Sequence, residues 1–175
     1  MKKRKITELN RISTEEFKQT KKIPLIVVLD NIRSLNNIGS VFRTSDAFVV
    51  ESIFLCGITA TPPHVEIHKT ALGAEDSVDW RYFEETENAI SLLKSEGVQV
   101  FAVEQVHNSL KLDELSLDKS KRYAVVLGNE VKGVQQSVVD ICNGAIEIPQ
   151  YGTKHSLNVS ISAGIVIWDF FKLLR

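Results

Sequence analysis

The 175-residue sequence predicts an α/β domain with a mostly parallel sheet and helices on both faces. Short runs rich in β-branched residues alternate with segments of helical spacing along the whole chain, as in α/β proteins. The run PLIVVLD at 24–30 shows no polar alternation, which is typical of a strand buried on both faces of a parallel sheet. The chain contains no internal repeat or linker and is long enough for one sizeable core, so we expect one domain.

The pattern places the elements in a regular order. The predicted strands are 24–30, 52–56, 80–84, 98–103, 123–128 and 145–149. The predicted helices are 11–22, 37–48, 66–75 (helix or turn), 86–97, 134–144 and a terminal helix from about residue 156. Because ligands of parallel sheets bind beyond the carboxyl ends of the strands, the segments that follow the strands are the places to look for a site.

Several residues are expected to begin or end these helices. Ser13 and Glu16 match a capping box at the first helix. The amide side chains of Asn36 and Asn37 are expected to cap the helix at 37–48, and Ser156 is expected to cap the terminal helix. Gly97 is expected to end the helix at 86–97, and Gly144 the helix at 134–144.

Charge divides the chain into two parts. Residues 1–22 hold eight Lys or Arg against three Glu, whereas the whole chain has a net charge of −1. We therefore expect a basic, partly helical extension at 1–22 and the main domain at 23–175. The extension is either a solvated end of the chain or an arm that contacts phosphates.

The remaining composition excludes several classes of protein. No apolar run is as long as the roughly 18 residues of a membrane span, and the charged N-terminus does not resemble a signal peptide, so a cytoplasmic location is expected. Cys56 and Cys142 are far apart in the sequence and are expected to be reduced thiols. His64 and His68 lack further ligands of zinc spacing, so no metal is expected.

Aromatic residues at 80–84 have two interpretations. Trp80, Tyr82 and Phe83 lie in a predicted strand and are expected in the core. The alternative is that they stack on the bases of a nucleic acid.

Three post-strand segments carry polar residues together with glycine. In the first, Asn37 precedes Arg43 by six residues on the expected helix. In the second, Gly128 and Gly133 flank Glu130, which suggests a tight turn that approaches a ligand. The alternative for the first segment is a helix cap with a surface arginine, and for the second an ordinary strand-to-helix turn. No G-x-G-x-x-G or Walker-type loop is present.

The third segment explains the polar start of the terminal helix. Ser156 and Asn158 open a helix that is otherwise strongly apolar. A helix N-terminus offers free N–H groups, and these side chains add a hydroxyl and an amide, so the position suits a ligand.

Together the three segments resemble the three motifs of the SpoU (TrmH-like) branch of the SPOUT RNA methyltransferases. The motifs read NNIGSVFRTSDAF (36–48), VVLGNEVKGV (125–134) and IEIPQYGTKHSLNVSISAGIVIWDF (146–170), in the family's order and spacing. The resemblance implies a C-terminal deep trefoil knot, S-adenosylmethionine as methyl donor, and a ribose 2'-hydroxyl of RNA as acceptor. It also implies a homodimer with each active site formed across the interface, and the apolar terminal helix fits packing on a partner.

Functional roles come from the resemblance, position by position. Arg43 is similar to the family's catalytic arginine, Asn37 to its first-motif asparagine and Glu130 to its second-motif glutamate. Ser156 and Asn158 match the third-motif pair. The donor pocket that the resemblance implies is formed mostly by backbone, near Val103, Gly128, Ile148, Ser156 and Leu157.

The chemistry requires the 2'-oxygen to lie in line with the methyl group and a route for its proton. Arginine stays protonated in proteins, so we expect Arg43 to orient the substrate and stabilise the developing alkoxide. The proton is then expected to leave through a phosphate, Ser156 or water.

The substrate is less directly indicated. Many relatives carry an N-terminal RNA-binding domain, whereas this chain has the short basic segment and resembles the minimal members, many of which act on tRNA. We therefore expect tRNA rather than rRNA. The alternatives are an rRNA enzyme, an inactive RNA-binding protein of the same fold, and an unrelated nucleotide-binding α/β domain.

Overall fold

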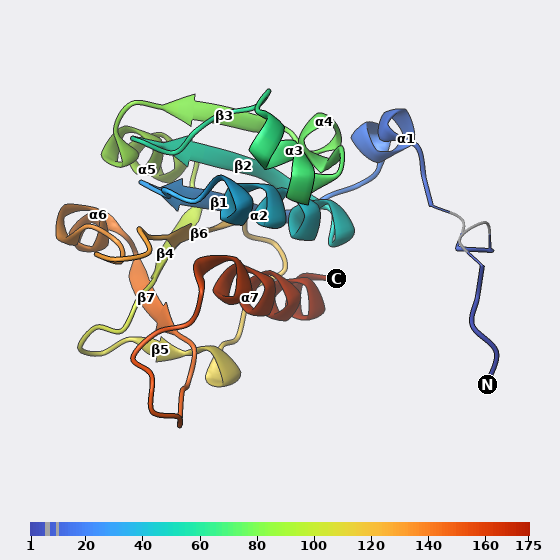
Figure 1. Cartoon of the computed structure of the whole chain (residues 1–175). Coiled ribbons are helices and arrows are strands. Elements are labelled where there is room, and N and C mark those ends of the chain that lie inside the picture. Colours follow the sequence, from blue (N-terminus) through green and yellow to red (C-terminus); the bar gives the residue numbers. More distant parts are fainter. Residues whose placement is uncertain (6–7, 10) are drawn as a thin grey trace.

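A computed structural model of the chain, which describes residues 1–5, 8–9 and 11–175, contains a single sheet of parallel strands (Figure 1). The strand order is β3-β2-β1-β6-β4-β7-β5, and every pair is parallel. The strands are β1 (Ile23–Asp30), β2 (Val50–Cys56), β3 (Trp80–Phe83), β4 (Gln99–Val103), β5 (Leu110–Lys111), β6 (Tyr123–Leu127) and β7 (Gly144–Glu147). The six predicted strands are confirmed, whereas β5 was not predicted because two residues give no readable periodicity.

Helices cover both faces of the sheet, as predicted. They are α1 (Thr14–Gln19), α2 (Leu35–Ala47), α3 (Val65–Ala71), α4 (Ala74–Ser77), α5 (Thr86–Ser95), α6 (Gln136–Ile141) and α7 (Val159–Leu174), with a 3-10 turn η2 (Leu112–Glu114). The predicted segment 66–75 forms two helices, because Leu72 and Gly73 take the left-handed backbone conformation between them.

The central strand β1 divides the interior into two cores. Alternate side chains of a strand point to opposite faces. Leu25, Val27 and Leu29 accordingly join a core with α1, α2, α3, α4 and α7, while Ile26 and Val28 join a core with α5 and α6. All five side chains are buried, which confirms that this strand is covered on both faces.

Three predicted helix ends are wrong. Ser34 rather than Asn36 or Asn37 caps α2, and its hydroxyl accepts from the Asn37 N–H. Asn158 rather than Ser156 caps α7, which begins at Val159. Helix α6 ends at Ile141 rather than at the predicted Gly144, which is the first residue of β7. A Cβ atom at Gly144 would lie 3.3 Å from the Phe101 ring, so a larger residue there requires a small movement of the ring.

Other expectations about single residues are tested directly. The capping box of α1 is present, and Gly97 follows α5 with a φ of 77°. Both cysteines are free thiols. Tyr82 is not in the core: it is 49% exposed on β3 at the sheet edge, and its hydroxyl donates to the Gly57 carbonyl.

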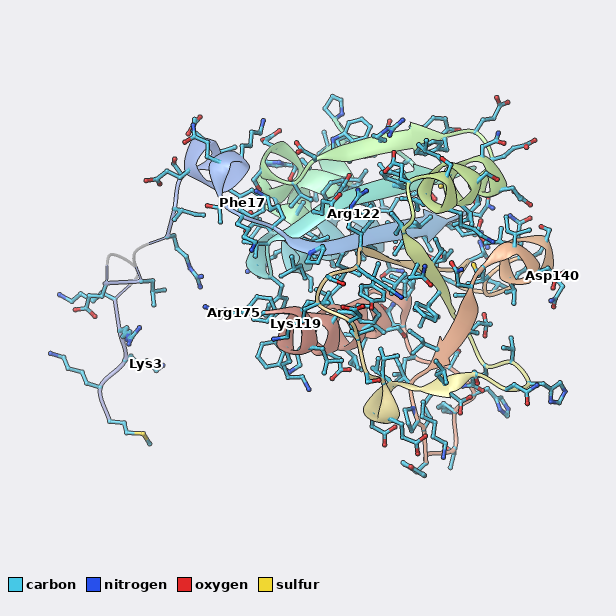
Figure 2. All side chains as sticks on the ribbon, turned by 180° about the vertical axis from the view of Figure 1, so that it is seen from behind. Lys3, Phe17, Lys119, Arg122, Asp140 and Arg175 are labelled. Atoms are coloured by element: carbon cyan, nitrogen blue, oxygen red, sulfur yellow. The ribbon has the colours of Figure 1, made fainter. Side chains whose placement is uncertain are left out.

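The N-terminal segment leads away from the body before α1 (Figure 1). Phe17 on α1 turns toward the body and is buried, whereas Lys3 lies out along the segment (Figure 2). At the other terminus, Lys119 donates to the Arg175 carbonyl at 2.6 Å, which ties the end of α7 to the loop before β6 (Figure 2). None of the helices in the described part of the chain is long and apolar enough to cross a membrane.

Candidate functional site

A pocket of about 680 Å³ opens at the carboxyl ends of β4, β6 and β7. Three stretches of chain form its walls: the residues after β4, the loop 128–134 after β6, and the segment 148–158 that leads into α7. The predicted donor residues all lie in this lining: Val103, Gly128, Ile148, Ser156 and Leu157. The size is in the range of ordinary small-molecule sites.

Glycine allows the loop after β6 to fold back on itself. A Cβ atom at Gly128 would lie 2.1 Å from the backbone of Gly133 and Val134, so a side chain there requires the loop to move. The Gly133 N–H donates to the Asn129 carbonyl at 2.9 Å, which closes the turn. The turn predicted from the two glycines around Glu130 is therefore present.

The Glu130 carboxylate joins the first and second motifs. It accepts hydrogen bonds from the backbone N–H groups of Arg33 and Ser34, both at 3.0 Å. It also accepts from the Asn37 side-chain amide at 3.1 Å. These three donors belong to the segment that opens α2, so the loop after β6 is fixed against the loop after β1.

These donors also set the ionisation of Glu130. Desolvation is the largest single influence and raises its pKa, but the hydrogen bonds from backbone N–H groups and from Asn37 outweigh it. The net effect is a pKa below the usual glutamate value. The hydrogen bonds therefore favour the ionised carboxylate of Glu130, which suits it to accept from these three donors.

Asn158 adds the third motif to this network. Its side-chain amide donates to the Asn37 side-chain oxygen at 3.2 Å. Its oxygen accepts from the N–H groups of Ser160 and Ile161 at the start of α7. One residue thus caps α7 and connects it, through Asn37, to Glu130.

Two predicted catalytic residues lie outside this network. Arg43 is exposed on α2, two turns beyond Asn37, and is absent from the pocket lining described. Ser156 is exposed at the pocket rim. Neither side chain makes a hydrogen bond within the described part of the chain, so both are available to groups outside it.

A buried carboxylate behind the pocket was not predicted. Asp30 is fully buried at the end of β1 and accepts from the Thr86 hydroxyl at 2.6 Å, the Asn31 amide at 2.8 Å, and both the backbone and side-chain N–H groups of Gln135 at 3.1 Å. Asn129 is tied to the same region, since its amide donates to the Asn31 carbonyl at 2.7 Å. An aspartate at the end of an apolar run was the available signal.

Glu104 was also missed as a site residue. It lines the pocket and accepts from the Val134 N–H at 3.0 Å. It stands directly after a predicted strand, a position where site residues are expected. Among the described residues, no group of three or more His, Cys, Asp or Glu is placed to hold a metal ion.

The chain is similar in sequence and fold to known proteins. Residues 24–168 match the SpoU rRNA Methylase family. A tRNA (guanosine(18)-2'-O)-methyltransferase of Aquifex aeolicus is 31% identical over 151 residues, which are 83% of this chain and 67% of that protein. A 23S rRNA (guanosine-2'-O-)-methyltransferase RlmB of Nitrosomonas europaea is 30% identical over 169 residues, 95% of this chain and 64% of that protein.

The fold is also similar to that of a solved RNA methyltransferase structure. The AdoMet-bound rRNA methyltransferase of Sinorhizobium meliloti superposes with a TM-score of 0.80 at 27% identity, covering 91% of this chain and 60% of that one. This chain therefore spans about two thirds of the length of the three relatives.

The parallel sheet with a pocket at the carboxyl ends of its strands is an α/β ligand-binding architecture, and the family match and the relatives define the class as RNA methyltransferases. The chain belongs to the SpoU rRNA methylase family. It is a family of RNA 2'-O-methyltransferases that use S-adenosylmethionine.

Proposed function

We propose that this chain transfers a methyl group from S-adenosylmethionine to a ribose 2'-hydroxyl of tRNA. The observation that carries the proposal is the hydrogen-bonded series Glu130–Asn37–Asn158, which draws all three motifs together beside the pocket. The Aquifex relative is named for a tRNA guanosine, which supports tRNA, and the Nitrosomonas relative supports 23S rRNA as the alternative.

The pocket fits the donor in size and chemistry. Val103, Ile148 and Leu157 supply apolar surface beside exposed loop backbone, which suits an adenine ring. When bound, S-adenosylmethionine supplies a methyl group on a positively charged sulfur. The residues of the chain have to hold it, exclude water and orient the acceptor.

Arg43 is proposed to orient the RNA and to stabilise charge that develops on the 2'-oxygen. A guanidinium is always charged and binds anionic oxygen with paired N–H groups. The ribose proton leaves through a phosphate, Ser156 or water. Asn37, Glu130 and Asn158 hold the three loops in place.

A homodimer would explain where Arg43 acts. Ile161, Ile165 and Trp168 are exposed apolar residues at helical spacing along one side of α7, and Leu157 is exposed just before the helix begins. Helix α2 packs against the same helix. We propose that this stripe meets a second copy, so that each site is completed across the interface and Arg43 serves it there. Exposed apolar stripes of this kind are typical of interaction surfaces.

The remaining proposals concern topology and boundaries. We propose that the segment leading into α7 is threaded through the chain as a trefoil knot, which is supported by the similarity in fold to a TrmH/SpoU tRNA modifying enzyme. Residues 1–22 form a basic extension that contacts RNA phosphates, and 23–175 form the methyltransferase domain. We also propose a cytoplasmic location, which the proposed RNA substrates support.

The test is transfer of labelled methyl from S-adenosylmethionine to unmodified total tRNA and, separately, to rRNA, followed by mapping of the modified nucleotide. Arg43→Ala and Arg43→Lys are compared with Arg81→Ala, which removes an exposed arginine on β3. We expect tRNA methylation that both Arg43 variants lose and Arg81→Ala keeps.

Each other outcome assigns a different function. Methylation of rRNA alone would retain the chemistry and change the substrate. Donor binding without transfer to either RNA would favour the inactive RNA-binding alternative. Near-normal turnover of Arg43→Lys would show that a guanidinium is not specifically required.

A further inference from the structure

The donor pocket carries more negative than positive charge. Three of its lining side chains are carboxylates, Glu104, Glu130 and Glu147, whereas Lys132 and His155 are the basic ones in the described lining. Glu130 is already fully engaged with the first motif. Glu104 is the carboxylate that connects two walls of the pocket.

Backbone hydrogen bonds hold the Glu104 carboxylate in place. One oxygen accepts from the Val134 N–H and the other from the Gln105 N–H, both at 3.0 Å. The backbone N–H of Glu104 donates to the Ile146 carbonyl at 3.0 Å. Gly133 lies directly against it, because a Cβ at Gly133 would be 2.2 Å from a Glu104 oxygen.

No Lys, Arg or His forms an ion pair with Glu104 among the described residues. An anion held by neutral donors beside a partly enclosed cavity favours a positively charged occupant. The proposed donor is such an occupant.

The methyl transfer changes the charge of that occupant. The bond between sulfur and methyl breaks, a bond between the 2'-oxygen and methyl forms, and the hydroxyl proton is released. The sulfonium thereby becomes a neutral thioether, so S-adenosylhomocysteine has one positive charge fewer than the donor.

We propose that Glu104 makes the pocket prefer the cationic methyl donor to the neutral product, which favours release of the product after each turnover. The inference rests on the proposed use of S-adenosylmethionine. It assigns Glu104 a role in cofactor selectivity that is separate from the orientation of RNA by Arg43.

The test measures binding of three ligands to the full-length protein by calorimetry: S-adenosylmethionine, S-adenosylhomocysteine and sinefungin, whose protonated amine replaces the sulfonium methyl. In Glu104→Gln, affinity for the two cations should fall about four- to thirty-fold, as expected for loss of a charge–charge attraction within a partly solvated pocket. Affinity for S-adenosylhomocysteine should change less than two-fold, roughly, because that ligand lacks the sulfonium charge.

Two controls separate charge from structure. Ile148→Ala removes apolar surface from the pocket lining and keeps the carboxylate, so it should weaken all three ligands in equal proportion. Glu87→Gln removes a half-buried carboxylate of α5 outside the pocket and should change none.

The outcomes are distinguishable. Equal weakening of all three ligands in Glu104→Gln, or no change, would overturn the selectivity role while leaving the proposed function intact. A wild-type protein that binds neither the donor nor the product would overturn the proposed function itself. A shift in the ratio of donor to product affinity supports the inference.

Discussion

The side-chain amide of Asn158 donates to the side-chain oxygen of Asn37 at 3.2 Å, across 121 positions of sequence. The other end of the same amide caps α7. The two functions therefore rest on different atoms of Asn158, and substitutions can separate them.

Replacement of Asn158 by Asp keeps the capping oxygen and removes the N–H donor to Asn37. We expect thermal stability close to that of the wild type and methyl transfer reduced about ten-fold, the equivalent of one hydrogen bond. Asn158→Ala should also lower the free energy of unfolding by about 1 kcal/mol, because the cap is lost. Thermal unfolding and initial rates measure the two effects, and an Asp variant with full activity would contradict the linking role.

The pH dependence of stability should include a contribution from Glu130. Its pKa in the folded protein lies below the usual value of 4.5, so the carboxylate binds its donors more favourably when ionised. This contribution is complete above the unfolded pKa and is lost as the pH falls through the lower folded pKa. Urea unfolding of wild type and Glu130→Gln should differ most near neutral pH and converge in acid; a constant difference at every pH would refute this.

The buried carboxylate of Asp30 should be important for stability. Asp30→Ala leaves the buried Thr86 hydroxyl and the partly buried N–H donors of Asn31 and Gln135 without their acceptor. We expect the free energy of unfolding to fall by about 2–4 kcal/mol. Denaturant titration measures it, with the exposed Asp140→Asn as a control that should stay close to wild type.

Both cysteine thiols should react slowly in the folded protein. Burial is the main cause that raises the pKa of Cys56 to about 12 and that of Cys142 to about 11. Since the thiolate is the reactive form, iodoacetamide should label Cys142, which is partly exposed, slowly, and Cys56 more slowly still. Mass spectrometry of native and urea-unfolded protein tests this, and rapid native labelling of Cys56 would contradict it.

The proposed dimer depends on the exposed stripe of α7. Trp168 is 48% exposed, and its ring centroid lies 5.3 Å from that of Phe48, which directly follows α2. Trp168→Glu should convert a dimer to a monomer in light scattering, because it buries a charge at the interface. Leu110→Glu, at an exposed apolar residue of β5, should leave the mass unchanged. A monomeric wild type would refute the proposal.

Much of the fold could be read from local patterns. The continuous apolar run of β1 predicted burial on both faces, and periodicity located the larger helices. Helix ends were less predictable, because several polar residues near each end can reach the first N–H groups. The backbone decides between Ser34 and Asn37, or between Ser156 and Asn158.

By itself, the sequence determined the class of fold, the three polar segments after strands and the residues that were expected to meet at the site. Only the tertiary structure decided how they meet. Val103, Gly128 and Leu157 line one pocket, Asn158 reaches Asn37, and Arg43 lies outside that pocket. The physical reason is that strand order and loop crossings bring distant segments together, and local periodicity carries no information about either.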